Sequence, residues 1–406
     1  MNVVTGRLTV MWFLAVAVTI GCSSETPPVS VAPSALPDVQ ASSDSPSDVT
    51  ADEAEAFANE WEELVRAGDT ARGQQLFLFD RIIERTISNL SLDAATATGV
   101  RQGLRQSQPM VGLLNMLHQA ETNGGHYRAV RTAVRGGHQH VVFRLVDASG
   151  ALNYHDLRLV RDGGTVRADQ LFVAATGEEL ADTMTNAMAP AAQSQQSIVG
   201  RLDGTAAKRT ADLKHQAEMM NQIRAGQKQQ ALQTYEKISE EGRKSKITQL
   251  GRVMATSVED EKQYLTVLDE YAARFPNDPS LALISLDASY LRKDAERLRS
   301  SYDAVQKWTG GDDYLTLMVS SLLAQIGEPQ QATELYKSVD VSTIELAQMH
   351  DFGLSLSLEL QNHDATLLHL RLLRDQFGYQ FDDLSAAEGF ENFAKSEQFK
   401  QWANEI

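Results

Sequence analysis

The chain has 406 residues, 42% of them hydrophobic and 22% charged, which is enough apolar sequence for two or three units with substantial cores. Acidic residues number 54 and basic residues 37, so the formal net charge is -17, and no run of Lys or Arg stands out. This balance argues against binding to nucleic acid and against electrostatic adhesion to anionic lipid.

The N-terminus has the pattern of an export signal. Arg7 precedes an apolar stretch at 8–20, which is short for a membrane-spanning helix but suits the hydrophobic region of a signal peptide. This stretch ends in Thr19-Ile20-Gly21-Cys22, and Cys22 is the only cysteine in the chain. These four residues resemble the lipobox of bacterial lipoproteins, although that family usually has Leu at the position of Thr19.

The resemblance implies that residues 1–21 are removed as a signal peptide and that the thiol of Cys22 carries a diacylglycerol. The protein would then belong to the bacterial cell envelope, held to a membrane by lipid alone and facing the periplasm or the exterior. Ser23 after the cysteine favours the outer membrane by analogy with the family. Two other interpretations stay open: an ordinary cleaved signal, and an uncleaved anchor with a buried, inert cysteine.

The segment 22–50 is predicted to be a disordered tether. Apart from Cys22 it is mostly Pro, Ser, Ala and Asp, with almost no large apolar side chain, so burial cannot offset the entropy lost on ordering. No later stretch approaches eighteen consecutive apolar residues, so we expect the remainder of the chain to lie outside the bilayer.

Helical patterns begin at residue 51. Phe57, Trp61 and Val65 recur on one face at four-residue steps, which predicts a first helix. A second is expected around 76–87 and a third over 94–120. The apolar period then changes from 3.6 to 2.

Four short segments rich in Val, Tyr, Phe and Leu follow, separated by Gly- and Asp-rich turns of hairpin length. They are 127–134, 138–146, 152–160 and 165–173. We therefore expect an α+β domain over 51–188, with three helices covering one face of a four-stranded antiparallel sheet. Helices followed by such a meander resemble the cystatin-like, ketosteroid-isomerase-type roll, a likeness of topology that no sequence motif carries.

A linker is predicted at 189–204, and after it apolar positions recur with a fixed period through 205–380. The first position of each unit falls at successive steps of 33, 34, 34 and 34, at Ala231, Tyr264, Leu298, Ala332 and Thr366. Four residues later stand Tyr235, Leu268, Tyr302, Tyr336 and Leu370, and seven later Ile238, Tyr271, Val305, Val339 and Leu373. We call these residues the ladder. Their period is typical of stacked helical hairpins.

Two units show more than the period, because a glycine stands five residues before the small residue and nine before an aromatic. They are Gly226, Ala231 and Tyr235, and Gly327, Ala332 and Tyr336. This pattern resembles the tetratricopeptide repeat, in which a small residue on the second helix lets it approach the first. Tyr264, Leu298 and Thr366 depart from the family, so the other hairpins must splay or repack. An irregular helical bundle remains the alternative.

The C-terminal segment 381–406 is predicted to form capping helices. Phe390, Phe393, Phe399 and Trp402 are interleaved with Glu and Lys, as suits helices that cover the last hairpin.

In the tetratricopeptide family the first helix of each hairpin lines a concave groove that binds protein. Carried onto this sequence, the groove positions are Gln216, Met220, Arg224, Gln249, Val253, Leu283, Asp287, Tyr290, Tyr314, Leu317 and Ser321. The set contains little Lys or Asn, so it does not resemble the family's clamp for C-terminal carboxylates. An apolar-polar helical or extended peptide is the expected ligand. These residues could equally serve to pack the hairpins together.

Residues suited to catalysis or metal binding occur only in isolation. His138 and His140 share one face of a predicted strand and His155 could lie opposite, but neither a cysteine nor a carboxylate completes a ligand spacing. Asp156 and Asp169 could lie inside a roll as a general base does, yet solvated or turn positions are commoner for Asp. We find no phosphate loop, nucleophile elbow or zinc-protease motif.

The sequence thus predicts a mainly α protein: an α+β domain followed by tetratricopeptide-like helical repeats. We expect no enzymatic activity and no cofactor, and we expect other proteins to bind through the repeat groove of a lipid-anchored scaffold in the cell envelope. The alternative is that the roll domain binds a small ligand or holds an active site, which the repeats position.

Overall fold

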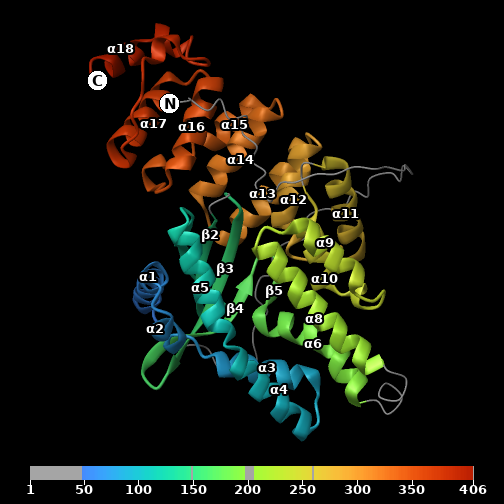
Figure 1. The fold of residues 1–406 in the computed structure, drawn as a ribbon. Helices are drawn as coiled ribbons and strands as arrows, with labels where there is room; N and C mark the ends of the chain where they lie inside the picture. The colour runs from blue at the N-terminus through green and yellow to red at the C-terminus, as the bar shows by residue number, and fades with distance from the viewer. Residues whose placement is uncertain (1–47, 148–149, 197–204, 258–259, 406) are drawn as a thin grey trace. The chain divides into compact units, whose positions relative to one another are not determined.

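The structure, a computed structural model, describes residues 48–147, 150–196, 205–257 and 260–405 (Figure 1). The predicted signal peptide and Cys22 lie outside these residues, as does the tether apart from 48–50. Within the described ranges, no helix combines the length and apolar character that a membrane crossing requires. The described chain divides into two compact units, 48–284 and 285–405, which we treat separately.

The unit 48–284 begins with five helices where three were predicted. They are α1 (Ala51–Ala67), α2 (Thr70–Gln75), α3 (Phe79–Leu90), α4 (Ala94–Ser107) and α5 (Pro109–Thr122). The pattern at 94–120 is divided because Gln108 has a left-handed backbone, with φ of 45°, and Pro109 opens a new helix at its first position. At the start of α1, Thr50 and Glu53 form a capping box, with the amide of Thr50 donating to Glu53 Oε2 at 2.9 Å.

The sheet is an antiparallel meander in the order β1-β2-β3-β4-β5. Its strands are β1 (His126–Arg135), β2 (His138–Val146), β3 (Leu152–Asp162), β4 (Thr165–Val173) and β5 (Glu178–Glu179). The four predicted strands are all present, whereas the two-residue β5 was not predicted. Two-residue turns join β1 to β2 and β3 to β4, and both glycines of each have positive φ, as a type I′ hairpin requires.

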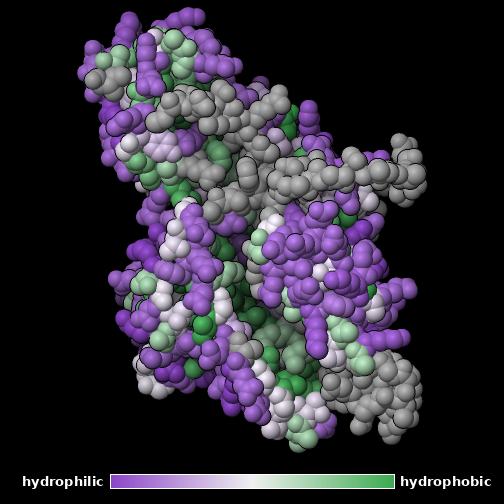
Figure 2. Space-filling view, viewed as in Figure 1, coloured by the Kyte–Doolittle hydropathy of each residue, from purple (hydrophilic) through white to green (hydrophobic). Residues whose placement is uncertain are grey.

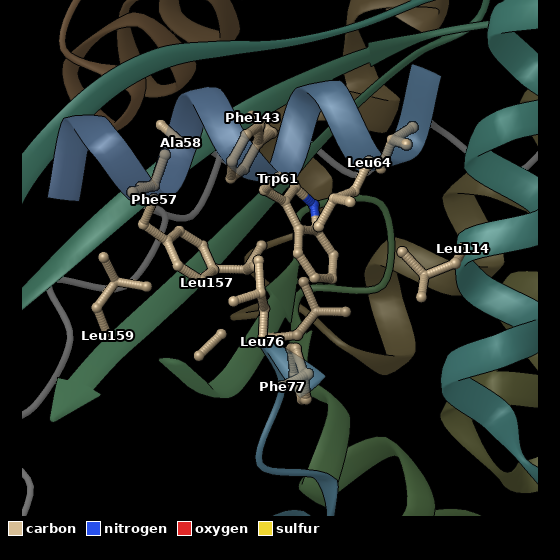
Figure 3. Close-up of a cluster of buried hydrophobic side chains, with 14 of the residues drawn as sticks. Phe57, Ala58, Trp61, Leu64, Leu76, Phe77, Leu114, Phe143, Leu157 and Leu159 are labelled. Carbon is tan, nitrogen blue, oxygen red and sulfur yellow. The ribbon is translucent and has the colours of Figure 1, made fainter. Parts of the chain in front are cut away.

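One hydrophobic core lies between the helices and the sheet. Figure 3 shows Trp61 on α1 among Leu64, Leu76 and Leu114 on one side and Phe143 and Leu157 of the sheet on the other. The Trp61 side chain is completely buried, so truncating it to Ala would cost about 3–5 kcal/mol. The helices therefore cover the sheet as the sequence predicted.

The predicted linker at 189–204 is helical in its described part, 189–196, so the prediction of a linker there was wrong. The helix α6 (Leu180–Gln196) extends into 189–204 and packs against α3 and α8 (Thr205–Arg224). β5 and the turn before it also contact the later part of the unit. Lys246 Nζ on α10 lies 3.1 Å from Glu178 Oε1 on β5 and 2.8 Å from Asp278 Oδ2. Because Gly177 has a φ of 62° and a Cβ there would stand 2.6 Å from the amide nitrogen of Ser280, only glycine fits this approach.

From α8 to α17 the helices come in consecutive pairs. The first helices are α8, α10 (Lys246–Ala255), α12 (Leu281–Leu291), α14 (Asp313–Gln325) and α16 (Ala347–Glu359). The second helices are α9 (Lys228–Lys237), α11 (Glu261–Arg274), α13 (Ala295–Thr309), α15 (Pro329–Tyr336) and α17 (His363–Phe377). The α8–α9, α10–α11, α14–α15 and α16–α17 pairs pack against each other, and α12 and α13 hold the corresponding place in the chain. We refer to each pair as a hairpin.

The second helices begin at residues 228, 261, 295, 329 and 363, which are steps of 33, 34, 34 and 34. These are the steps of the ladder. The first ladder residue of each unit stands at the fourth position of the second helix of that unit. All five of these residues are buried, at 5% exposure or less. The period in the sequence is therefore a period of helix starts.

The turn inside a hairpin needs a residue with left-handed backbone. Gly226 and Gly327 supply it in two hairpins, with φ of 73° and 92°. Lys293 and Gln361 occupy the same place in two others, with φ of 54° and 53°, although they carry side chains. The hairpin geometry is thus kept where the glycine is lost.

The unit 285–405 ends in a cap on α17. It consists of the short 3-10 helices η3 (Leu384–Ala386) and η4 (Phe393–Lys395) and of α18 (Glu397–Ala403). Phe393 and Trp402 are buried in one cluster with Leu370 and Leu373 of α17. The aromatic residues of the tail thus pack on α17, where capping helices were predicted and one α-helix with two short 3-10 helices is found.

Candidate functional site

The first helices α8 and α10 are joined by a polar link at one of the predicted groove residues. Gln216 Nε2 donates to Thr248 Oγ1 at 2.8 Å and lies 3.3 Å from Ser245 Oγ, and Ser245 is the N-cap of α10. Gln216 remains partly exposed. It therefore fixes the first two hairpins to each other and still presents a polar edge to solvent.

Close helix packing sets the neighbouring positions. A Cβ at Gly251 would stand closer than 3.0 Å to the methyl carbon of Met219, so α8 and α10 approach where α10 has no side chain. Met220 beside it is partly exposed, whereas Val253 is buried. Gln249 is also buried, with its amide 3.2 Å from the hydroxyl of Tyr235. Of these groove positions, Met220 is the one left accessible.

The side chain of Arg224 lies outside the described residues, although its backbone belongs to α8. The surface around α9 and α10 is mainly hydrophilic in Figure 2. In this view the surface around α9 and α10 therefore presents polar side chains rather than a broad apolar patch.

In the unit 285–405, another polar link joins α12 to α14. The hydroxyl of Tyr290 donates to Gln325 Oε1 at 2.9 Å, and Gln325 Nε2 lies 3.3 Å from Ser321 Oγ. Tyr290 is partly exposed and Ser321 is buried. The link has the same role as that of Gln216, since it ties consecutive first helices through neutral side chains.

Three predicted groove residues are wholly interior because α14 is buried on every face. Each residue from 314 to 324 is buried, which includes Tyr314, Leu317 and Ser321. Leu283 on α12 is buried too. At these four positions the packing interpretation fits the observed burial better than an open groove does.

Asp287 on α12 differs from its neighbours in having a carboxylate that pairs with none of the described residues. Among the described residues it makes no hydrogen bond or ion pair through its side chain, and it is only partly exposed. Burial raises the pKa of Asp287 to about 7. An ammonium or guanidinium group placed beside it would stabilise the charged form, so this carboxylate is suited to receive a cation.

The three strand histidines do not converge. His138 and His140 point to one face of the sheet, whereas His155 pairs across β2–β3 with Phe143 and so points to the other. Within the described chain, no three His, Cys, Asp or Glu side chains form a group that could hold a metal ion.

The two strand aspartates are engaged in ion pairs. Asp156 accepts a hydrogen bond from His140 Nδ1 at 2.8 Å and another from Arg135. Asp169 accepts from Arg158 Nε at 2.9 Å and from Arg85 Nη2 at 2.7 Å. Burial acts to raise the pKa of Asp169, but the hydrogen bonds and charges of these two arginines outweigh it and lower the pKa. Such a carboxylate is a poor general base.

Large side chains occupy the place where a roll would bind a ligand. Phe143 and Leu157 are completely or almost completely buried in the core beneath α1, and Leu145 packs against the same core. Phe172 pairs with Asp156 across β3–β4, so it lies on the other face of the sheet. The face beneath α1 is therefore packed with hydrocarbon, as Figure 3 shows.

A buried polar cluster in the last two hairpins was not predicted from the sequence. It contains Tyr336, His350 and His369. The sequence identified Tyr336 only as a ladder residue. It gave no sign that His350 and His369 lie together with Tyr336, because the three residues come from three different helices. Gly353, a glycine inside a helical pattern three residues after His350, was the one available sign of a close approach.

Comparison with known proteins gives no relative of this chain: no protein-family model, no curated protein and no solved structure matches it. Its function has to be inferred from the geometry and the sequence patterns alone.

Proposed function

We propose that this protein is a lipid-anchored scaffold of the bacterial cell envelope whose tetratricopeptide-like hairpins bind another protein. The observation that carries the proposal is the register of the second helices, which begin at steps of 33, 34, 34 and 34 residues. Stacked hairpins of this period create extended surfaces, which such proteins use for binding. The N-terminal α+β domain would serve as a second binding module or as a spacer.

The chemistry of the partner is suggested by charge. The chain carries a formal charge of -17, and Asp287 is a half-buried carboxylate without a partner among the described residues. A peptide with a Lys or Arg side chain, or a free amino terminus, would supply the missing cation. We therefore expect a partner with a positively charged segment.

Site-specific photo-crosslinking in intact cells tests the binding surface. A photoreactive residue at Met220 or Asp287, on the first helices, should give a crosslinked product of defined mass. The matched controls are Gln233 and Lys307, which are exposed on the second helices of the same hairpins. Identical products from all four positions, or none from Met220 and Asp287, would contradict the proposal.

The charge argument has a separate test. Asp287→Asn should weaken recovery of the crosslinked partner several-fold at pH 7.5, whereas Asp303→Asn on the exposed side of the same hairpin should leave it unchanged. Equal effects of the two substitutions would show that the partner does not bind to the carboxylate of Asp287.

The anchor is tested by Cys22→Ser. Membrane fractionation should find the wild-type protein with membranes and the variant in the soluble fraction, since two or more acyl chains are what hold a tethered protein stably. A variant that still fractionates with membranes would show that Cys22 is not the point of attachment.

A further inference from the structure

Three buried polar side chains from three helices form a continuous hydrogen-bonded chain in the unit 285–405. Tyr336 Oη on α15 lies 2.7 Å from His369 Nε2 on α17. His369 Nδ1 lies 3.2 Å from His350 Nδ1 on α16, and His350 Nε2 lies 2.9 Å from the carbonyl oxygen of Ile344. Both imidazoles are fully buried.

The partners allow only one arrangement of protons when both rings are neutral. The carbonyl of Ile344 can only accept, so His350 carries its hydrogen on Nε2 and accepts at Nδ1. His369 must then donate from Nδ1 and accept at Nε2. The hydroxyl of Tyr336 therefore donates to His369, and all the hydrogen bonds run in one direction, from Tyr336 to Ile344.

The fold reserves the space that the central imidazole occupies. A Cβ at Gly353 on α16 would stand closer than 3.0 Å to three atoms of the His369 ring. A glycine inside a helix costs about 1 kcal/mol relative to Ala, so its presence here is explained by the ring that packs on it. The ring of His369 therefore packs directly on the backbone of α16 at Gly353.

One added proton breaks this arrangement. A proton on His369 Nε2 turns that nitrogen into a donor toward Tyr336. The hydroxyl hydrogen of Tyr336 then has no acceptor among the other members of the hydrogen-bonded chain. A proton on His350 Nδ1 sets two N–H groups against each other, unless His369 shifts its hydrogen to Nε2 and again displaces the Tyr336 hydroxyl. Either way a positive charge is left in a buried site.

The groups that act on the two imidazoles are each other, the hydroxyl of Tyr336 and the carbonyl of Ile344. Burial and the nearby His350 lower the pKa of His369 to about 3, and burial lowers the pKa of His350 despite its bond to the Ile344 carbonyl. Other titratable groups on the packed elements are paired elsewhere or exposed: Asp351 with Tyr379, Arg371 and Arg374 with Glu405, Asp364 with Gln398, Asp313 with the amide of Asp340, and Glu334, Lys337, Glu345, Glu359 and Asp375 on the surface.

We propose that the Tyr336–His369–His350 chain is a pH-sensitive latch, which keeps the α16–α17 hairpin closed on α15 only while both imidazoles are neutral. Free imidazole has a pKa near 6.5, so each histidine that is exposed by opening takes up a proton below that pH. At pH 5.5 this favours the open state by about tenfold for each histidine. The latch does not depend on the proposed partner binding, because it lies within the packing of the last hairpins.

Hydrogen exchange of the whole soluble chain tests the latch. After correction for the intrinsic rate, the opening constant of α16 and α17 should rise about threefold to thirtyfold between pH 7.5 and pH 5.5. This is less than the effect of the histidines alone, because burial raises the pKa of Asp351 on α16 to about 6 and its protonation favours the closed state. The hairpin α10–α11, which contains no histidine, should change much less. An equal rise in both hairpins, or none in α16–α17, would overturn the proposal.

A variant tests whether the three hydrogen-bonded side chains cause the pH response. The triple substitution Tyr336→Phe, His350→Met and His369→Met replaces it with apolar groups and should remove the pH response, whereas His363→Gln on the same helix should keep it. If the triple variant does not fold at pH 7.5, nitrogen NMR of the wild-type histidines decides. Both rings must stay neutral in the closed protein down to pH 5.5, and a ring that titrates there near pH 6.5 refutes the latch.

Discussion

Replacing Gly353 by Ala should destabilise the last hairpins, although the same change inside most helices is favourable. A methyl group at this position meets the ring of His369, with three ring atoms closer than 3.0 Å. The ring cannot yield freely, because it is bonded to Tyr336 on one side and to His350 on the other.

The magnitude follows from three contributions. Exchange of Gly for Ala in a helix interior gains about 1 kcal/mol. Overpacking of a well-filled core costs about 1–3 kcal/mol, and the two hydrogen bonds of the displaced ring are worth about 1 kcal/mol each. The net expectation is a loss of about 2–4 kcal/mol in the free energy of opening of α16.

The assay is hydrogen exchange of the α16 and α17 amides at pH 7.5, supported by urea unfolding followed by circular dichroism. Gly103→Ala on α4 is the matched control, because no heavy atom would lie within 4 Å of its added methyl group. That variant should gain about 1 kcal/mol. If Gly353→Ala also stabilised its helix, the reserved space and the latch built on it would both be wrong.

Three further changes test other parts of the structure. Lys293→Gly should stabilise its hairpin by about 0.5–1 kcal/mol in urea unfolding, because the φ of 54° suits glycine, whereas Lys293→Ala should give no gain. Asp351→Asn should raise stability at pH 8 by about 1–2 kcal/mol after allowance for partial exposure, since burial raises the pKa of Asp351 to about 6, above its unfolded value. The contribution of Asp351 taken alone stabilises the wild type as the pH falls from 7 to 4, so the advantage of this variant should vanish by pH 4. The difference between the urea midpoints of the variant and the wild type at the two pH values checks the sign. Lys246→Met leaves Glu178 and Asp278 without their shared cation and should lower the free energy of unfolding by about 2–4 kcal/mol. The loss should appear as faster hydrogen exchange at 177–180, and unchanged exchange there would show that the ion pair is dispensable.

The helix starts could be predicted because a repeat constrains many positions at once. The ladder from Ala231 to Thr366 sets the phase of five second helices, and a buried side chain at the fourth position of each follows from that phase. The strands could also be predicted from the sequence, since turns such as Gly163-Gly164 mark where they end. In both cases the signal is local in the sequence and repeated along it.

The details that the sequence did not predict depend on contacts between distant residues or on single backbone angles. The helical period continues across Gln108 and Pro109, so the period alone gave one helix over 94–120. Pro109 is compatible with the start of a helix, but the left-handed angle of Gln108 that breaks the segment is known only from the structure. The burial of Leu317 depends on what surrounds α14, and the opposite orientations of His140 and His155 depend on the register of β2 and β3. A periodic pattern identifies the inner side of an element but does not say what that side touches.

The left-handed turn residues give the chain a natural unit of length. Lys293 and Gly327 are 34 residues apart, and Gly327 and Gln361 are again 34 apart. Excising residues 294–327 would join Lys293 directly to Glu328 and leave every later turn and ladder position in phase. The excised segment holds α13 and α14, one second helix and the first helix that follows it, so α12 and α15 would form the new hairpin. A gene for this protein can therefore gain or lose one such two-helix repeat in a single in-frame event, and the array can change its length without any new helix having to evolve.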